Sequence, residues 1–361
     1  MNNSKLFLFI LLFIFCSWRS YAQDPSFSQI ENTKSYTHPS LFTMRQGIEL
    51  GMAHRIQWNK LYGDFKTTYF SAFLQHNERI GLGYGITYLQ DEEGDGKLKT
   101  QNFNLNIRAL RTIGIKLPKL GLTISHVIIS MYVGVIKKSI DWSKLVFSDQ
   151  IDPVWGIDKA SGQSFPQLEN SLIMTNGFGF TFKGYKIISQ RRLPFNLSFD
   201  VKHANIFARE EESLLGLHAL LPRLIAFTAS TTFQPSEYYG LPLLKPVLRF
   251  ESQMGIKRME YGSLIGLAKE SQTIYTGLYY SQQWSPFNYL NANSFIILIG
   301  FEKATNSILY TFGYSYDFNT SGFDNRNSGG THEITLNIIF NTSKKSFSQP
   351  SNIFERCGAR F

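Results

Sequence analysis

The stretch Thr331-His-Glu-Ile-Thr-Leu-Asn-Ile-Ile-Phe340 decides the fold, because its residues alternate between two chemical types. One set is mostly apolar and consists of His332, Ile334, Leu336, Ile338 and Phe340; the other is Thr331, Glu333, Thr335 and Asn337, with Ile339 as the exception. A period of two predicts a β-strand with one apolar and one polar face. An aromatic residue ending the apolar face, close to the chain end, is typical of the closing strand of an outer-membrane β-barrel. Taken alone, the same pattern also fits any half-buried edge strand.

The rest of the chain repeats this behaviour in segments that favour strand. In residues 101–109, four apolar or small side chains alternate with Asn102, Asn104, Asn106 and Arg108, a polar face that suits a wet lumen. We predict strands at 45–56, 65–77, 80–89, 100–110, 120–136, 172–183, 195–204, 223–234, 245–256, 258–268, 273–282, 293–302, 308–317 and 331–340. The fold class is therefore all-β: a transmembrane antiparallel β-barrel of about 14 strands, an even number as such barrels require.

Composition favours the same class. Aromatic residues make up 15% of the chain and charged residues 17%, below the roughly 25% charged residues usual in soluble domains. After the first 22 residues, no apolar run approaches the ~18 residues that a membrane helix needs. A chain rich in aromatic residues and strands but without membrane helices has the composition of a barrel.

The chain start has the pattern of a secretory signal peptide over residues 1–22. A short basic start to Lys5 precedes an apolar run from Leu6 to Phe15, and Ser20-Tyr-Ala22 offers a small-x-small cleavage site. We expect an N-terminal segment at 23–44, the barrel at 45–340 and a periplasmic tail at 341–361. After the signal only Cys357 remains, so no intramolecular disulfide is expected.

Connection lengths predict how the barrel is oriented. With both ends of the strand array in the periplasm, every odd-numbered connection lies outside, and the three longest predicted connections, 137–171, 205–222 and 318–330, are all odd-numbered. The protein is therefore expected in the Gram-negative outer membrane, with its long loops facing out.

Patterns for catalysis, cofactors or metals are missing. The seven histidines lack metal-ligand spacing, and no Gly-x-Ser-x-Gly elbow is present. Asp91-Glu-Glu-Gly-Asp-Gly96 superficially resembles a calcium loop, but it lacks the distal glutamate and fits an acidic hairpin tip better. The basic excess is diffuse and lacks stacked aromatics, which argues against nucleic acid. We predict no enzyme activity, no cofactor, no metal and no nucleic-acid partner.

The longest loop is the candidate partner-binding site. Its stretch Asp141-Trp-Ser-Lys-Leu-Val-Phe-Ser-Asp-Gln-Ile-Asp-Pro153 is too rich in aspartate and aromatic residues for a featureless linker. We predict Trp142 and Phe147 as buried anchors, with Asp141, Asp149 and Asp152 fixing the loop shape or meeting basic partner residues. The alternative is a loop that plugs the barrel mouth through Trp142 and Phe147.

Several of these stretches resemble one family. The 141–153 motif resembles a signature of the PorP/SprF family of type IX secretion outer-membrane proteins, and Gln23-Asp-Pro-Ser-Phe-Ser-Gln29 is similar to that family's mature N-terminus. Further similar stretches are Gly94-Asp-Gly96, Leu221-Pro-Arg223, Gly313-Tyr-Ser-Tyr-Asp317 and Ser328-Gly-Gly-Thr-His-Glu-Ile334. Two stretches depart from the family pattern: Thr37-His-Pro-Ser-Leu-Phe42, and Cys357-Gly-Ala-Arg-Phe361, which lacks the family's proline.

The resemblance implies an outer-membrane barrel that works with type IX secretion subunits in the periplasm and outer membrane. It also implies a part in the secretion or surface attachment of particular cargo proteins with C-terminal sorting domains. The first alternative is a passive channel or uptake barrel. It is disfavoured because the alternate strand faces are rich in Asn, Thr, Ser and Tyr and have few charges. The second is a periplasmic or secreted all-β binding protein.

Overall fold

The computed structural model describes a closed antiparallel barrel of fourteen strands. The described residues are 24–41, 46–61, 63, 65–76, 80–152, 154–158, 160–162, 170–188, 191–204, 206, 211–212, 218–219, 221–233, 242–269, 271–286, 292–320 and 328–342. The predicted signal peptide and all but two residues of the predicted tail lie outside them. The barrel strands are β1 (Gly47–Gln57), β2 (Phe65–Gln75), β3 (Leu82–Glu93), β4 (Leu98–Leu117), β5 (Leu122–Ser139), β8 (Asn170–Ile188), β9 (Arg191–Lys202), β12 (Leu224–Thr231), β13 (Leu243–Gln253), β14 (Ile256–Lys269), β15 (Gln272–Trp284), β16 (Ala292–Ala304), β17 (Ile308–Asn319) and β18 (Thr331–Asn341).

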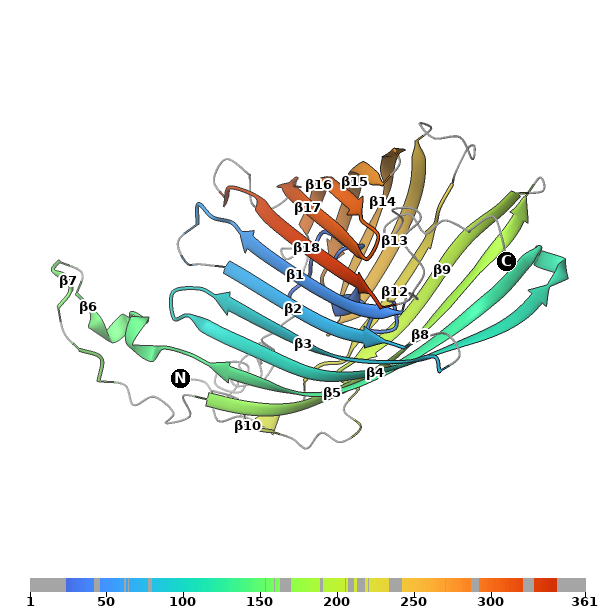
Figure 1. Cartoon of the computed structure of the whole chain (residues 1–361). Helices are drawn as coiled ribbons and strands as arrows, with labels where there is room; N and C mark the ends of the chain where they lie inside the picture. The colour runs from blue at the N-terminus through green and yellow to red at the C-terminus, as the bar shows by residue number, and fades with distance from the viewer. Residues whose placement is uncertain are drawn as a thin grey trace, which may run out of the picture.

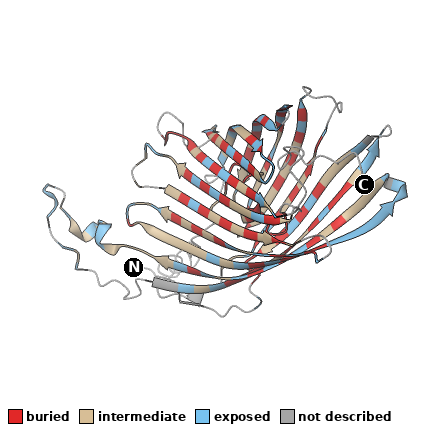
Figure 2. Cartoon of the chain, in the orientation of Figure 1, coloured by how far each residue is buried: buried red, intermediate tan, exposed pale blue. Residues whose placement is uncertain are grey.

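The barrel closes where the sequence predicts, between its first and last strands. β18 pairs with β1 from Asn341 opposite Gly47 to Thr331 opposite Gln57, without a break in register. In β18, Thr331, Glu333, Thr335 and Asn337 are buried, while Ile334, Leu336 and Phe340 are exposed on the outside. The polar face therefore lines the interior and the apolar face is left for lipid, an alternation that Figure 2 shows around the wall. Ile339, the exception to the pattern, packs inside against Ala304 and Leu309.

The fourteen predicted strands are all present, but several strand ends are misplaced. β3 ends at Glu93 rather than 89, β8 ends at Ile188 rather than 183, and β9 begins at Arg191 rather than 195. The largest error is at the end of β4. β4 was expected to end at residue 110, with 111–119 as a turn, yet it continues to Leu117. Gly114, which favours a turn in the sequence, instead takes a φ of +63° in a bulge between Thr112 and Ile115. Two small hairpins were not predicted: β6 (Ile151–Asp152) with β7 (Gly156–Ile157), and β10 (Glu211–Glu212) with β11 (His218–Ala219).

The barrel has two unlike ends. We call the end with connections 58–64, 94–97, 140–169, 203–223, 254–255, 285–291 and 320–330 the loop rim, and the opposite end, where β1 begins and β18 ends, the turn rim. The loop between β5 and β8 extends far from the loop rim, ending in β6 and β7 (Figure 1). At the turn rim, β4, β5, β8 and β9 run out past their neighbours (Figure 1).

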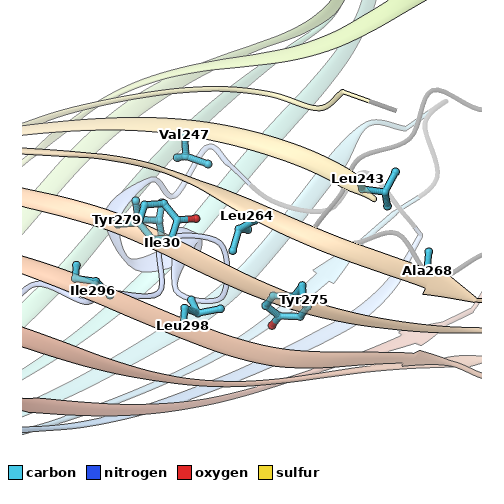
Figure 3. Packing of buried hydrophobic residues seen from close by; sticks show 9 residues of the cluster. All are labelled: Ile30, Leu243, Val247, Leu264, Ala268, Tyr275, Tyr279, Ile296 and Leu298. Carbon is cyan, nitrogen blue, oxygen red and sulfur yellow. The ribbon is translucent and has the colours of Figure 1, made fainter. Parts of the chain in front are cut away.

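The interior is filled by the chain's own N-terminal segment. Fourteen strands enclose a wider space than the eight whose wall side chains alone fill a barrel. Residues 24–41, which include the short helix α2 (Lys34–Thr37), occupy this space, and most of their side chains are buried. Ile30 lies against the inward-facing Leu264, Tyr279 and Leu298 (Figure 3). Within the described part of the chain, no helix is long and apolar enough to cross a membrane.

Candidate functional site

The inner wall of the barrel is charged, which corrects the expectation of few charges on the inward faces. Buried ionisable residues project inward from strands all around the barrel; they include Arg55, Arg108, Lys183, Asp200, Lys202, Lys245, Arg249, Glu260, Glu302, Asp317 and Glu333. Because unpaired charges out of bulk water are costly, such a wall requires partners of opposite charge. Residues 24–41, which we call the lumenal segment, supply some of these partners.

The first attachment of the lumenal segment centres on Arg55 of β1. Its guanidinium lies 3.0 Å from carboxylate oxygens of both Asp317 and Glu333. Glu333 in turn accepts hydrogen bonds from the backbone N–H groups of Ser28 and Gln29, at 2.8 and 2.9 Å. The Ser28 hydroxyl donates to Asp317 at 2.6 Å. One arginine thus holds together two strands and the first turn of the lumenal segment.

A second attachment joins the end of the segment to β9 and β12. The His38 ring is 2.7 Å from the Asp200 carboxylate through Nδ1 and 2.5 Å from the Thr228 hydroxyl through Nε2. Ser40 donates to the same carboxylate at 3.0 Å. Asp200 fits here because its neighbour on β8 is Gly179, where any Cβ would overlap the carboxylate.

A third attachment lies at the loop rim. Asp24 is 2.8 Å from His203, which follows β9, and its backbone N–H donates to Gln253 at 2.8 Å. Burial raises the pKa of the Asp24 carboxyl, but the charge of His203 and its hydrogen bond outweigh burial, so this pKa lies below its usual value. A carboxyl with a lowered pKa stabilises the folded state above its ordinary pKa and loses that contribution only as the pH falls further. The Asp24 carboxyl is therefore expected to stay ionised throughout the neutral range.

Apolar and aromatic contacts complete the seating of the segment. Phe27 is fully buried and packs edge-on against Tyr36, with ring centroids 5.1 Å apart, and both rings lie against Tyr69 of β2. The carbonyl of Phe27 accepts a hydrogen bond from Arg249 at 2.7 Å. Lys202 lies 3.5 Å above the Tyr36 ring. A remaining cavity beside Tyr36, Asn104 and Lys202 has a volume of about 20 Å³, room for one or two water molecules.

Gly313 of β17 gives a direct test of this packing. A Cβ at this position would overlap side-chain atoms of Gln29, Asn32 and Thr335. We expect Gly313→Val to disfavour the seated segment by roughly 1–3 kcal/mol, the usual cost of overpacking. Limited trypsin digestion measures it, because Lys34 is buried in the seated segment and becomes cleavable when the segment leaves.

The matched control is Gly85→Val. The three atoms nearest to its Cβ all belong to the barrel wall, to Phe73 and the backbone of Ala72. Lys34 should therefore stay protected in this variant. Equal cleavage at Lys34 in both variants would contradict the packing described above.

The long loop between β5 and β8 is shaped by the three aspartates that the sequence singles out. The Asp141 carboxylate accepts hydrogen bonds from the N–H and the hydroxyl of Ser143, at 3.2 and 2.6 Å. These bonds, together with the nearby charge of Lys144, lower the pKa of the Asp141 carboxyl below its usual value. Asp149 accepts from the hydroxyl of Ser161 and the N–H of Gly162, both at 2.9 Å.

Asp152 shapes the tip of the same loop. It accepts from the N–H groups of Trp155 and Val154 at 2.9 and 2.7 Å, and these bonds lower the pKa of its carboxyl. All three aspartates thus accept hydrogen bonds from residues of the loop itself.

The most exposed apolar side chains of this loop are not those singled out in the sequence. Trp142 and Phe147 are half-buried, whereas Trp155 is 80% exposed and Val154 78%. Ile151 and Ile157, paired across the β6–β7 hairpin, are also exposed. The loop extends away from the barrel (Figure 1), so the alternative of Trp142 and Phe147 plugging the mouth is wrong; the lumenal segment fills the interior instead.

The sequence signals for these features were weak. Trp155 falls just past the 141–153 motif, and its exposure depends on Asp152, which turns the chain at the hairpin tip. The lumenal segment has no periodicity, but it carries Phe27, Ile30, Tyr36 and Leu41 among polar residues, which was a signal of burial.

Among the described residues, no group of three or more His, Cys, Asp or Glu side chains is placed to hold a metal ion.

The chain was compared with known proteins and solved structures. A search of curated proteins gave no match. Solved structures with a similar fold include the CymD monoaromatic hydrocarbon channel, at 13% identity and a TM-score of 0.41, covering 91% of this chain and 95% of that one. They also include a Pseudomonas aeruginosa FadL homologue, at 11% identity and a TM-score of 0.38, covering 82% and 89%. CdiB from Escherichia coli aligns at 7% identity and a TM-score of 0.43, covering 81% of this chain and 63% of that one.

The family model for the type IX secretion system membrane protein PorP/SprF matches residues 19–338, which span the lumenal segment and nearly the whole barrel. The resemblance seen in the sequence motifs is thereby confirmed, and the chain belongs to the PorP/SprF family of type IX secretion system membrane proteins.

Proposed function

We propose that this protein is a docking barrel of the type IX secretion system. It would hold a particular cargo protein, or a subunit of the machine, at the loop rim, with no solute passing through its interior. The observation that carries the proposal is the occupied lumen, in which residues 24–41 are bound to the wall by buried contacts such as Glu31 with Lys245 and His38 with Asp200, and by hydrogen bonds. A barrel filled in this way serves as an anchor for its loops.

The loop between β5 and β8 supports a protein-binding role. Its aspartates bond to their own loop, so the exposed side chains near them are presented on a defined scaffold. Aromatic residues presented by a shaped loop are frequent centres of protein interfaces. We propose Trp155 and Val154 as the central contacts, with Trp142 and Phe147 at their flank and Asp141, Asp149 and Asp152 holding the geometry.

The proposed partners are of two kinds. Cargo with a C-terminal sorting domain would meet the loop rim, and periplasmic machine subunits would meet the turn rim. This assignment follows from the orientation expected from the connection lengths, with the long loops outside. It makes the protein an assisting, non-enzymatic subunit in secretion or surface attachment.

A deletion strain complemented with variants tests the proposal. The wild-type gene should restore surface display of one dedicated cargo, while general secretion continues with or without it. A variant whose residues 142–160 are replaced by a Gly/Ser linker should insert in the outer membrane at normal levels yet fail to restore display. Full display with the linker variant would overturn the assignment of this loop, and unchanged display in the deletion strain would overturn the proposed function.

A further inference from the structure

At the turn rim, four strands form a sheet that stands clear of the barrel. β3 begins at Leu82, opposite Ala109, so β4 runs on for eight residues, 110–117, beyond its neighbour on that side. On the far side, β12 ends at Thr231, opposite Phe195, whereas β9 begins at Arg191. The ends of β4, β5, β8 and β9 therefore make a small antiparallel sheet, which we call the rim sheet; Figure 1 shows it running out past the other strands.

One edge of the rim sheet is open. Gly81 accepts from the N–H of Leu110, and Ile80 accepts from the Arg111 side chain, but beyond Arg111 no strand of the described chain pairs with β4 on this side. Residues 111–119 are all exposed. An edge strand of this kind presents unpaired backbone donors and acceptors to which another extended chain can add.

The charge of the rim sheet is uniform. Its exposed basic residues are Arg111, Lys116, Lys119, Lys186 and Arg192. Neither 110–126 nor 182–195 contains an aspartate or glutamate. A second copy of the same edge would meet like charges, which disfavours self-pairing, whereas an acidic segment would be attracted. Between the charges, Ile113, Ile115 and Leu117 are exposed and offer apolar contacts to an added strand.

The length of the rim sheet favours a protein partner over the membrane surface. From Leu110 to Leu117 the strand extends on the order of 20 Å at about 3.3 Å per residue. Each polar headgroup layer of a bilayer is only about 5–8 Å thick. Barrel strands tilt by about 35–45°, so this length rises on the order of 15 Å, which still exceeds one headgroup layer. If the bilayer boundary lies at the rim of the closed wall, lipid phosphates reach the base of the rim sheet, and its outer half, with Lys116 and Lys119, stands in water.

We propose that the open edge of β4 at residues 112–117 binds an acidic, extended segment of a partner protein as an added antiparallel strand. Backbone hydrogen bonds would align the added strand with β4, and the basic residues of the rim sheet would select an acidic partner. This inference rests on the part of the proposed function that places machine subunits at the turn rim, and it is independent of the loop between β5 and β8 at the opposite rim.

The test uses the full-length barrel in detergent and two acetylated ten-residue peptides, one alternating Glu with Val and the other alternating Lys with Val. The acidic peptide should bind at least tenfold more tightly than the basic one, and its affinity should fall as salt is raised. Hydrogen exchange should slow at amides within 112–117 when the acidic peptide is bound, and not elsewhere in the barrel.

Charge reversal provides the specificity control. The triple variant Arg111→Glu, Lys116→Glu, Lys119→Glu should lose at least tenfold in affinity for the acidic peptide. The matched variant Arg223→Glu, Lys257→Glu, which reverses exposed charges at the loop rim, should bind as the wild type does. Unaltered mobility of the folded barrel on unheated gels shows that each variant has folded.

Three outcomes would overturn the proposal. The first is equal binding of both peptides, and the second is binding of the acidic peptide without slowed exchange at 112–117. The third is association of the wild type with anionic phosphatidylglycerol vesicles, lost in the triple variant, in the absence of peptide binding; this would assign the rim sheet to the membrane surface instead.

Discussion

Arg55→Ala is expected to destabilise the protein by roughly 3–5 kcal/mol, because it leaves two buried carboxylates, Asp317 and Glu333, without their shared cation. The loss should appear first as release of the lumenal segment, since Glu333 also binds the backbone of Ser28 and Gln29. Urea unfolding in detergent measures the free energy, and trypsin cleavage after Lys34 measures the release.

The matched control for Arg55→Ala is Arg223→Ala, which removes an exposed arginine at the loop rim. Its unfolding free energy should stay within about 0.5 kcal/mol of the wild type, as for most surface substitutions. If Arg55→Ala behaves like this control, the Arg55 cluster does not hold the segment and the described attachment is wrong.

Trp155→Ala is expected to weaken partner binding at the loop rim by about 2 kcal/mol or more, on the order of 30-fold in Kd. The reason is its position, since it is 80% exposed and held at the hairpin tip by the bond from its own N–H to Asp152. The measurement is the affinity of the purified barrel for the C-terminal sorting domain of the cargo whose display requires this protein.

Trp284→Ala is the control, because Trp284 ends β15 at the same rim and is also exposed. It should leave the affinity unchanged. Equal loss in both variants would point to a general disturbance of the rim, and no loss in Trp155→Ala would remove this residue from the interface.

The strands were predictable because a barrel wall imposes one local rule on every strand. Residues such as Asn104 and Leu105, or Glu333 and Ile334, alternate between an interior and a lipid-facing environment, and that alternation is written in adjacent positions. The extension of β4 was missed although Ile113, Ile115 and Leu117 still alternate with more polar residues, because Gly114 favours a turn in the sequence and in the structure sits in a bulge.

The lumenal segment could not be predicted in the same way. Its contacts are set by the three-dimensional closure of the barrel, as with Ser28 and Glu333, which lie 305 residues apart in sequence. The charged residues of the inner wall can be read in the strand sequences. Because a water-filled lumen tolerates isolated polar groups, however, Arg55 and Asp317 alone do not predict that another segment of the chain binds to them. Similarly, the 141–153 motif includes Asp152, but Trp155, whose backbone N–H donates a hydrogen bond to Asp152, lies beyond the motif.

The central claim is that the chain's own residues 24–41 close this barrel and make it an anchor. Conductance across a planar bilayer tests it most directly, comparing the full-length protein with a variant that lacks residues 24–41. The full-length protein should carry no steady current, and the deletion variant should open a pore lined by the charged inner wall. Steady conductance of the full-length protein, equal to that of the deletion variant, would contradict the account and identify the protein as a passive channel.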